Sequence, residues 1–80
     1  MTQIQKLLKS FLKNPQSCRY RDMVKVLKLV GFAEVSVKGS HVKFKHPQLP
    51  QDLVIPVHNN DCKEFYKREA RKLVESILNS

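Results

Sequence analysis

The chain has 80 residues, which fits one domain, and a domain of this size buries only about 60 to 65% of its unfolded surface, so an internal cavity for a large cofactor is not expected. A formal charge of +8 favours a polyanion such as nucleic acid, or an acidic protein, as the partner. Two cysteines are too few for a disulfide framework or a zinc site, and no apolar run has the length of a signal sequence or a membrane span, so we expect a cytoplasmic protein with reduced thiols and no membrane partner.

Two helices are predicted in the first part of the chain. Thr2 with Gln5 three residues later forms a capping-box pattern, and apolar residues at helical spacing follow, which predicts a helix over about residues 3–13. The segment around Pro15 ends this helix. A second apolar stripe predicts a helix over about residues 21–30, which Gly31 ends.

Three strands and one helix are predicted in the remainder of the chain. The strands span about residues 32–37, 41–46 and 53–57, and Pro56 belongs at a sheet edge, a bulge or a strand end because it cannot donate a ladder hydrogen bond. The last helix spans about residues 62–79. One domain over residues 1–80 is therefore predicted to have an α+β fold in the order α-α-β-β-β-α, a three-stranded antiparallel sheet with helices packed on one face.

Gly39 and Ser40 form the predicted turn between the first two strands, because Gly at the first position of a two-residue turn supplies the positive φ that such turns need. On one face, the resulting register pairs Lys38 with His41, Ser36 with Lys43 and Glu34 with Lys45. On the other face, it pairs Val37 with Val42 and Val35 with Phe44. The polar face therefore presents an imidazole among ammonium groups, a composition suited to chemistry on a phosphodiester.

Three segments of the chain resemble the HicA family of toxins from prokaryotic toxin-antitoxin pairs. They are Lys38-Gly39-Ser40-His41, Phe44-Lys45-His46-Pro47 and Ile55-Pro56-Val57-His58, within a resemblance that covers about residues 5–60. The resemblance implies a fold similar to a double-stranded-RNA-binding domain. It also implies an endoribonuclease (mRNA interferase) that cleaves mRNA with no metal or other cofactor, and neutralisation by an acidic HicB-like antitoxin.

The same resemblance places the family's catalytic histidine at His41. The chain departs from the family pattern at Val42, where many members have a second histidine, and over residues 64–78, which lack the commonest family ending. Both departures leave His41 in place. As a general acid or base, His41 would move a proton during cleavage.

Other polar residues are assigned around His41. Lys43 and Lys45 follow it on the same face of the strand, where they would contact phosphates without reading the base sequence. His58 is assigned either to phosphate binding or to a structural hydrogen bond, and His46 to a structural or merely exposed role. The predicted RNA-binding set is Lys38, Gly39, Ser40, Lys43, Lys45 and His58.

The carboxylates and the cations of the first and last helices are not assigned to this site. The seven carboxylates are scattered, so no metal site is predicted. The cations of the first and last helices are interpreted as solvated faces, namely Lys6, Lys9 and Lys13, and Lys63, Lys67 and Arg71. Two other functions stay open at this point. One is a non-catalytic RNA-binding module, which would tolerate loss of His41, and the other is a protein-interaction domain whose basic face docks an acidic partner.

Overall fold

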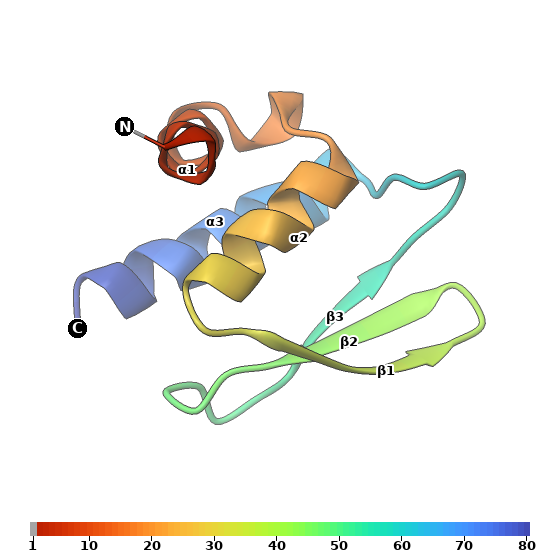
Figure 1. Ribbon diagram of the computed structural model, residues 1–80. Coiled ribbons are helices and arrows are strands. Elements are labelled where there is room, and N and C mark those ends of the chain that lie inside the picture. The colour runs from red at the N-terminus through yellow and green to blue at the C-terminus, as the bar shows by residue number, and fades with distance from the viewer. Residues whose placement is uncertain (1) are drawn as a thin grey trace.

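Three helices and a three-stranded antiparallel sheet make up the computed structural model, which describes residues 2–80. The elements are α1 (Gln3–Lys13), a short 3-10 turn η1 (Pro15–Ser17), α2 (Tyr20–Leu29), β1 (Ala33–Lys38), β2 (His41–Lys45), β3 (Leu53–Pro56) and α3 (Glu64–Leu78). The strands lie in the order β1-β2-β3, and all three helices lie on one side of the sheet (Figure 1). The predicted α+β fold and its element order are confirmed. In the described residues, no helix combines the length and the apolar character needed to cross a bilayer.

The helices form two layers above the sheet. α2 and α3 lie over the sheet, and α1 packs on α2, α3 and η1 on the side away from the strands (Figure 1). The core includes one fully buried residue of α1, Phe11, and continues through α2 and α3 down to the sheet. Its members are Phe11, Met23, Val26, Leu27, Phe32, Val42, Phe44, Leu53, Ile55, Ala70 and Val74. The sheet face away from the helices therefore stays open.

The start of α1 and the end of α2 follow local sequence signals. The Thr2 hydroxyl accepts a hydrogen bond from the Gln5 N–H, and the Gln5 side chain accepts one from the Thr2 N–H, both at 3.3 Å. This capping box is the one predicted. After α2, Gly31 has a φ of +107°, and a Cβ at this position would lie 2.9 Å from Nε2 of His46. Gly31 is thus required by its conformation and by its neighbour.

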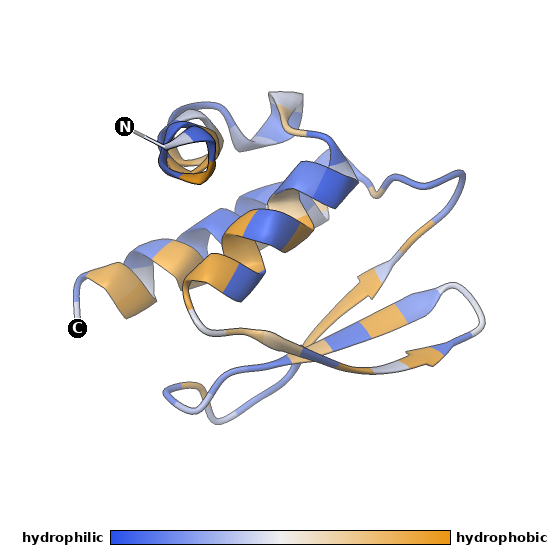
Figure 2. Ribbon diagram, viewed as in Figure 1, coloured by the Kyte–Doolittle hydropathy of each residue, from blue (hydrophilic) through white to orange (hydrophobic). Residues whose placement is uncertain are grey.

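Strand β2 shows the alternation that separates the core from the open face. Its hydrophilic and hydrophobic residues alternate along the strand (Figure 2). Val42 and Phe44 are 8% and 0% exposed, so they point toward the helices. His41, Lys43 and Lys45 therefore lie on the opposite, open face.

The predicted register of the β1–β2 hairpin is confirmed near the turn and is wrong farther from it. Lys38 pairs with His41, Val37 with Val42 and Ser36 with Lys43, as predicted, and Gly39 has a φ of +61°. A bulge between Glu34 and Ser36 then shifts the register, so Glu34 pairs with Phe44 and Ala33 with Lys45. The predicted pairs of Glu34 with Lys45 and Val35 with Phe44 are wrong.

The exposure of β1 explains this bulge. All six residues of the strand are exposed, including Val35 at 47% and Val37 at 60%. Register is strongly fixed where one face of a strand is buried, and an edge strand exposed on both faces lacks that constraint. Val35 and Val37 were predicted on an apolar face, but they do not enter the core.

Candidate active site

His41 lies on the open sheet face, at the end of the central strand that adjoins the hairpin turn. It is the first residue of β2, the central strand, with Lys38 opposite it on β1 and Pro56 opposite it on β3. Its side chain is exposed. An exposed imidazole between two strands is accessible to a large ligand that lies across the sheet, and imidazole is a group that commonly serves as a general acid or base.

The lysines around His41 are not equivalent. Lys38 is the direct cross-strand neighbour of His41, and Lys43 is two residues along the same strand face. The Lys43 ammonium lies 3.9 Å from a carboxylate oxygen of Asp52, with the two side chains 45% and 28% exposed. A solvated pair at this distance holds Lys43 weakly. Lys45 is exposed farther along the strand, opposite Ala33.

The third strand brings His58 to the same end of the sheet. The β2–β3 register pairs His41 with Pro56, and the Val57 N–H continues it by donating to the Ser40 carbonyl at 2.6 Å. His58 is the next residue, so it lies beside the Gly39-Ser40 turn and diagonally from His41. The structure thus brings together the residues predicted around the hairpin turn with His58.

His58 begins a tight turn that sequence reasoning missed. The His58 N–H donates to the Asp61 carbonyl at 2.8 Å, and the Asp61 N–H donates to the His58 carbonyl at 3.0 Å. Between them, Asn59 and Asn60 have φ values of 53° and 62°. Asn tolerates this left-handed conformation better than most residues. The adjacent Asn pair is the sequence signal that could have located the turn, and α3 accordingly begins at Glu64, two residues after its predicted start.

An ion pair between the buried Lys67 and the exposed Asp61 fixes this turn to α3. The Lys67 ammonium lies 3.0 Å from a carboxylate oxygen of Asp61, and Lys67 is only 5% exposed. The same carboxylate oxygen accepts the Cys62 N–H at 2.8 Å. The Cys62 N–H first, and then the Lys67 ammonium, hold the pKa of Asp61 below its ordinary value. The prediction that Lys67 belongs to a solvated stripe is wrong, because a carboxylate from another element makes its burial tolerable.

Arg71 also differs from a simple solvated cation. Its guanidinium donates to the carbonyl of Leu12 at 3.2 Å and pairs with Glu75 at 3.3 Å. This contact links α3 to the C-terminal end of α1. Two further α3 cations, Arg68 and Lys72, are also paired with carboxylates of their own helix. The cations of α3 from Lys67 onward therefore bind within the protein.

The two cysteines have no chemical role that the structure supports. Cys18 and Cys62 are free thiols. Burial raises the pKa of the Cys18 thiol, and it raises the pKa of Cys62 to about 11. A protonated thiol is a poor nucleophile and a poor metal ligand. Within residues 2–80, no group of three or more His, Cys, Asp or Glu side chains is placed to hold a metal ion.

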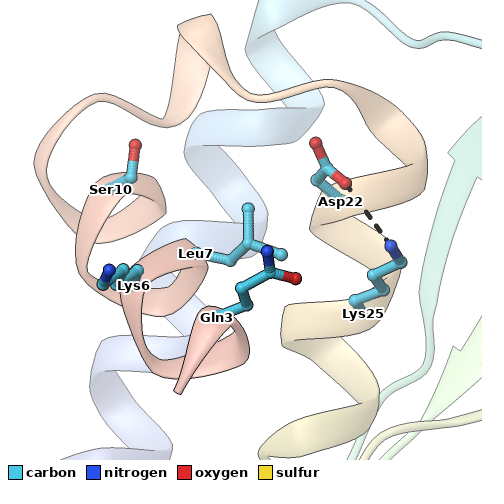
Figure 3. Close-up of a pocket in the computed structure, with 6 residues that line it drawn as sticks. All are labelled: Gln3, Lys6, Leu7, Ser10, Asp22 and Lys25. Atoms are coloured by element: carbon cyan, nitrogen blue, oxygen red, sulfur yellow. Dashed lines mark ion pairs between the residues drawn. The ribbon is translucent and has the colours of Figure 1, made fainter. Parts of the chain in front are cut away.

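The groove between α1 and α2 is separate from the His41 surface. Figure 3 shows its side chains, with Lys25 pointing toward Asp22 at 3.9 Å. It is lined by Gln3, Lys6, Leu7, Ser10, Asp22 and Lys25. α1 lies on the side of α2 and α3 away from the sheet (Figure 1), whereas the burial pattern of β2 places His41 on the sheet face away from the helices, so the groove is not part of the His41 surface.

Fold and site together define a small α+β domain that presents a histidine among lysines on an open sheet face. The family described as the HicA toxin of bacterial toxin-antitoxin matches residues 20–78 of the 80-residue chain. The chain therefore belongs to the HicA family, whose members are toxins of toxin-antitoxin systems. No curated protein and no solved structure matches the chain significantly.

The family match differs in extent from the resemblance seen in the sequence. It begins at residue 20, the start of α2, so α1 lies outside it. It ends at residue 78 and includes α3, which lies beyond the residues 5–60 of the resemblance seen in the sequence. The sheet, its hairpin and the two helices that cover it are thus the part of the chain that the family shares.

Proposed function

We propose that this HicA-family toxin is an endoribonuclease that cleaves mRNA without a metal and uses His41 as a general acid or base. The observation that supports this most directly is the exposure of His41 on the central strand, with Lys38 opposite it and Lys43 beside it. Imidazole has an ordinary pKa near neutrality, and a positioned acid or base accelerates proton transfer by roughly 10²- to 10⁴-fold.

The neighbouring lysines supply the charge that a metal supplies in other nucleases. Lys38, Lys43 and Lys45 would bind phosphates of the RNA and offset the charge that develops on the scissile phosphate. Gly39 and Ser40 form the edge of the same surface, and among the described residues nothing lies within 4 Å of a Cβ placed at Gly39. RNA backbone can therefore approach the turn closely.

The carboxylates support a mechanism based on cations. Asp52 and Asp61 are each engaged by a lysine, Lys43 and Lys67 respectively. They come from separate loops, so they do not form the paired carboxylate cluster that two divalent metals require. The available groups for transition-state charge are therefore ammonium groups.

Regulation by a partner follows from the same surface. A toxin of a toxin-antitoxin system acts with a partner antitoxin, and we infer that an acidic HicB-like antitoxin neutralises this toxin by covering His41, Lys43 and Lys45. Opposite charge would steer the two proteins together. Covering these residues would block access of RNA to the imidazole.

The deciding experiment compares wild type with His41→Ala on a mixed RNA substrate, with and without EDTA. We expect wild type to cleave in both conditions and His41→Ala to bind RNA without cleaving it. Lys72→Gln, on α3, is the control for purity and folding, and it should cleave as wild type does. RNA binding by a wild type that does not cleave would favour the non-catalytic RNA-binding module, and failure to bind RNA would favour the protein-docking domain.

A further inference from the structure

We propose that His58 is the second proton-transfer group of the cleavage reaction, paired with His41 across the scissile phosphate, and that the Asp61–Lys67 ion pair positions it. This inference rests on the ribonuclease function proposed above. It assigns a catalytic role to a residue of the loop after β3 and a positioning role to the pair formed by the exposed Asp61 and the buried Lys67.

The first argument is the register of β2 and β3. His41 is opposite Pro56, and the hydrogen bond from Val57 to Ser40 continues the ladder by one residue. His58 is therefore the diagonal neighbour of His41, and such neighbours lie about 7–8 Å apart between Cα atoms. Two imidazoles at this spacing can contact the same phosphodiester from its two sides.

The second argument is the direction of the side chains. Val57 is partly buried and packs against the core, whereas His58 is exposed. Side chains alternate between the two faces of an extended segment, so His58 lies on the open face together with His41. Both imidazoles are thus presented to a substrate that covers the end of the sheet.

The third argument is the rigidity of the segment that carries His58. Two backbone hydrogen bonds close the turn between His58 and Asp61, and its central residues have a left-handed conformation. Asp61 is then bound to Lys67, which lies one turn before the buried Ala70 of α3. A buried ammonium needs its carboxylate, so the pair fixes the turn to a helix that is itself held by the core.

In the proposed cleavage step, one histidine accepts a proton and the other donates one. One imidazole takes the proton of the ribose 2′-hydroxyl while the 2′ oxygen forms a bond to phosphorus. The P–O5′ bond breaks, its electron pair leaves with O5′, and the other histidine, as imidazolium, gives a proton to that oxygen. The products are a 2′,3′-cyclic phosphate and a 5′-hydroxyl, and water restores both protonation states.

Two histidines in opposite protonation states give a specific dependence on pH. The rate should rise and then fall with pH, because one imidazole must be neutral and the other protonated. Both imidazoles have charged neighbours. Lys38 and Lys43 lie near His41. His58 lines a shallow hollow together with Asp61, Lys63 and the neutral thiol of Cys62. Removing either histidine should remove one limb of the profile.

The test measures cleavage and RNA affinity for wild type, His41→Ala and His58→Ala. Affinity for a 2′-O-methyl RNA, which cannot be cut, should change by less than about 3-fold in either variant, while cleavage falls by about 10²- to 10⁴-fold. His58→Gln, which keeps a polar side chain but cannot carry the proton, should behave as His58→Ala does. Cleavage by His58→Ala at the wild-type rate, or with both limbs of the profile intact, would overturn the assignment.

A substrate with a better leaving group separates the two roles. At the cleavage site found with wild type, sulfur replaces the bridging 5′ oxygen, and a thiolate leaves without being protonated. We expect this RNA to restore cleavage in the variant that lacks the acid and not in the variant that lacks the base. Restoration of both variants, or of neither, would contradict a pair of histidines that divide the two transfers.

The two proposals fail differently. If wild type cuts RNA and His41→Ala does not, but His58→Ala cuts normally, the ribonuclease function stands and the role of His58 is wrong. If wild type cuts neither ordinary RNA nor the RNA with the bridging 5′ sulfur, both proposals are wrong.

The positioning role is tested with Asp61→Asn and Lys67→Met. In the protein that remains folded by circular dichroism, we expect kcat to fall at least about 10-fold with unchanged affinity for 2′-O-methyl RNA, because a small misplacement of a catalytic group is costly. Asp61→Glu should recover part of the rate. Lys72→Met removes an exposed ion pair of the same helix and is the matched control. Wild-type kcat in folded Asp61→Asn would show that the pair does not position His58, and if Asp61→Asn does not fold, wild-type kcat in folded Asp61→Glu or Lys67→Met decides the point in the same way.

Discussion

Nε2 of His46 lies 2.8 Å from the carbonyl oxygen of Val30, and this contact gives His46 a structural role. Nδ1 of His46 accepts the Gln48 N–H at 3.1 Å, so Nε2 carries the proton and donates to Val30. The ring is 6% exposed and lies edge-on to Phe32, with 5.0 Å between ring centroids. His46 therefore connects the end of β2 to the end of α2, and its structural interpretation is confirmed.

We predict that His46→Ala lowers the free energy of unfolding by about 1–3 kcal/mol, because it leaves the Val30 carbonyl and the Gln48 N–H without their partner. His41→Ala, at an exposed position, should change it by no more than about 0.5 kcal/mol. Urea denaturation of both variants measures the difference. Equal stability of the two would contradict the structural role of His46.

The two glycines allow a matched pair of substitutions. Both have positive φ, but a Cβ at Gly31 would lie 2.9 Å from His46 Nε2, whereas at Gly39 no described residue lies within 4 Å of it. We expect Gly39→Ala to cost about 1 kcal/mol from its backbone conformation alone. Gly31→Ala should cost clearly more, by about 1–3 kcal/mol, because it also displaces His46. Thermal unfolding of the two variants tests the order, and the reverse order would contradict it.

Local signals explain which parts of the fold could be predicted from sequence. The turn at Gly39 and the alternation from Ser36 to Lys43 determine the register of the hairpin next to its turn, without reference to the rest of the chain. The bulge at Val35 could not be predicted in this way, because the exposed edge strand has no buried face that would fix its register.

Contacts between distant elements explain what the sequence did not predict at the site. Lys67 has the helical position of a solvated cation in its own sequence, and its partner Asp61 belongs to a turn before the helix. A charged residue is predicted to be exposed unless its partner is known. The position of His58 beside the hairpin similarly depends on the pairing of β2 with β3, which only the folded sheet determines.

Asp61 should make the stability of the protein depend on acid pH. Its pKa is lowered below the ordinary 3.8, first by the Cys62 N–H and then by Lys67. Such a group stabilises the fold above its unfolded pKa, and the contribution is lost as pH falls through the lower, folded pKa. The stability difference between wild type and Asp61→Asn should be constant above about pH 5 and shrink as pH falls below 3.8. Urea denaturation over a pH series measures it, and a difference that grows on acidification would contradict this assignment.

Binding of an acidic antitoxin should depend strongly on salt. The open face carries Lys38, Lys43 and Lys45, so association should slow by about tenfold or more as the salt concentration rises, while dissociation changes less. Stopped-flow mixing over a salt series measures both rates. In the complex, His41 should lose its solvent exposure. A complex in which His41 stays accessible and RNA is still cut would contradict the blocking mechanism.

Lys43 and Lys45 should contribute unequally to RNA binding. Lys43 must give up its contact with Asp52 at 3.9 Å to bind a phosphate, whereas Lys45 is exposed on the same face. Because that contact is weak, we expect Lys45→Gln to weaken binding only slightly more than Lys43→Gln, and each to affect many RNA sequences alike. Each lost phosphate contact should flatten the salt dependence of log K by roughly 0.7, the coefficient for single strands. Lys72→Gln, at a paired position on α3, is the control and should leave both quantities unchanged. If the double variant of Lys43 and Lys45 keeps wild-type affinity and salt slope, the open sheet face is not the RNA surface, and the lysines of α1 become the next candidates.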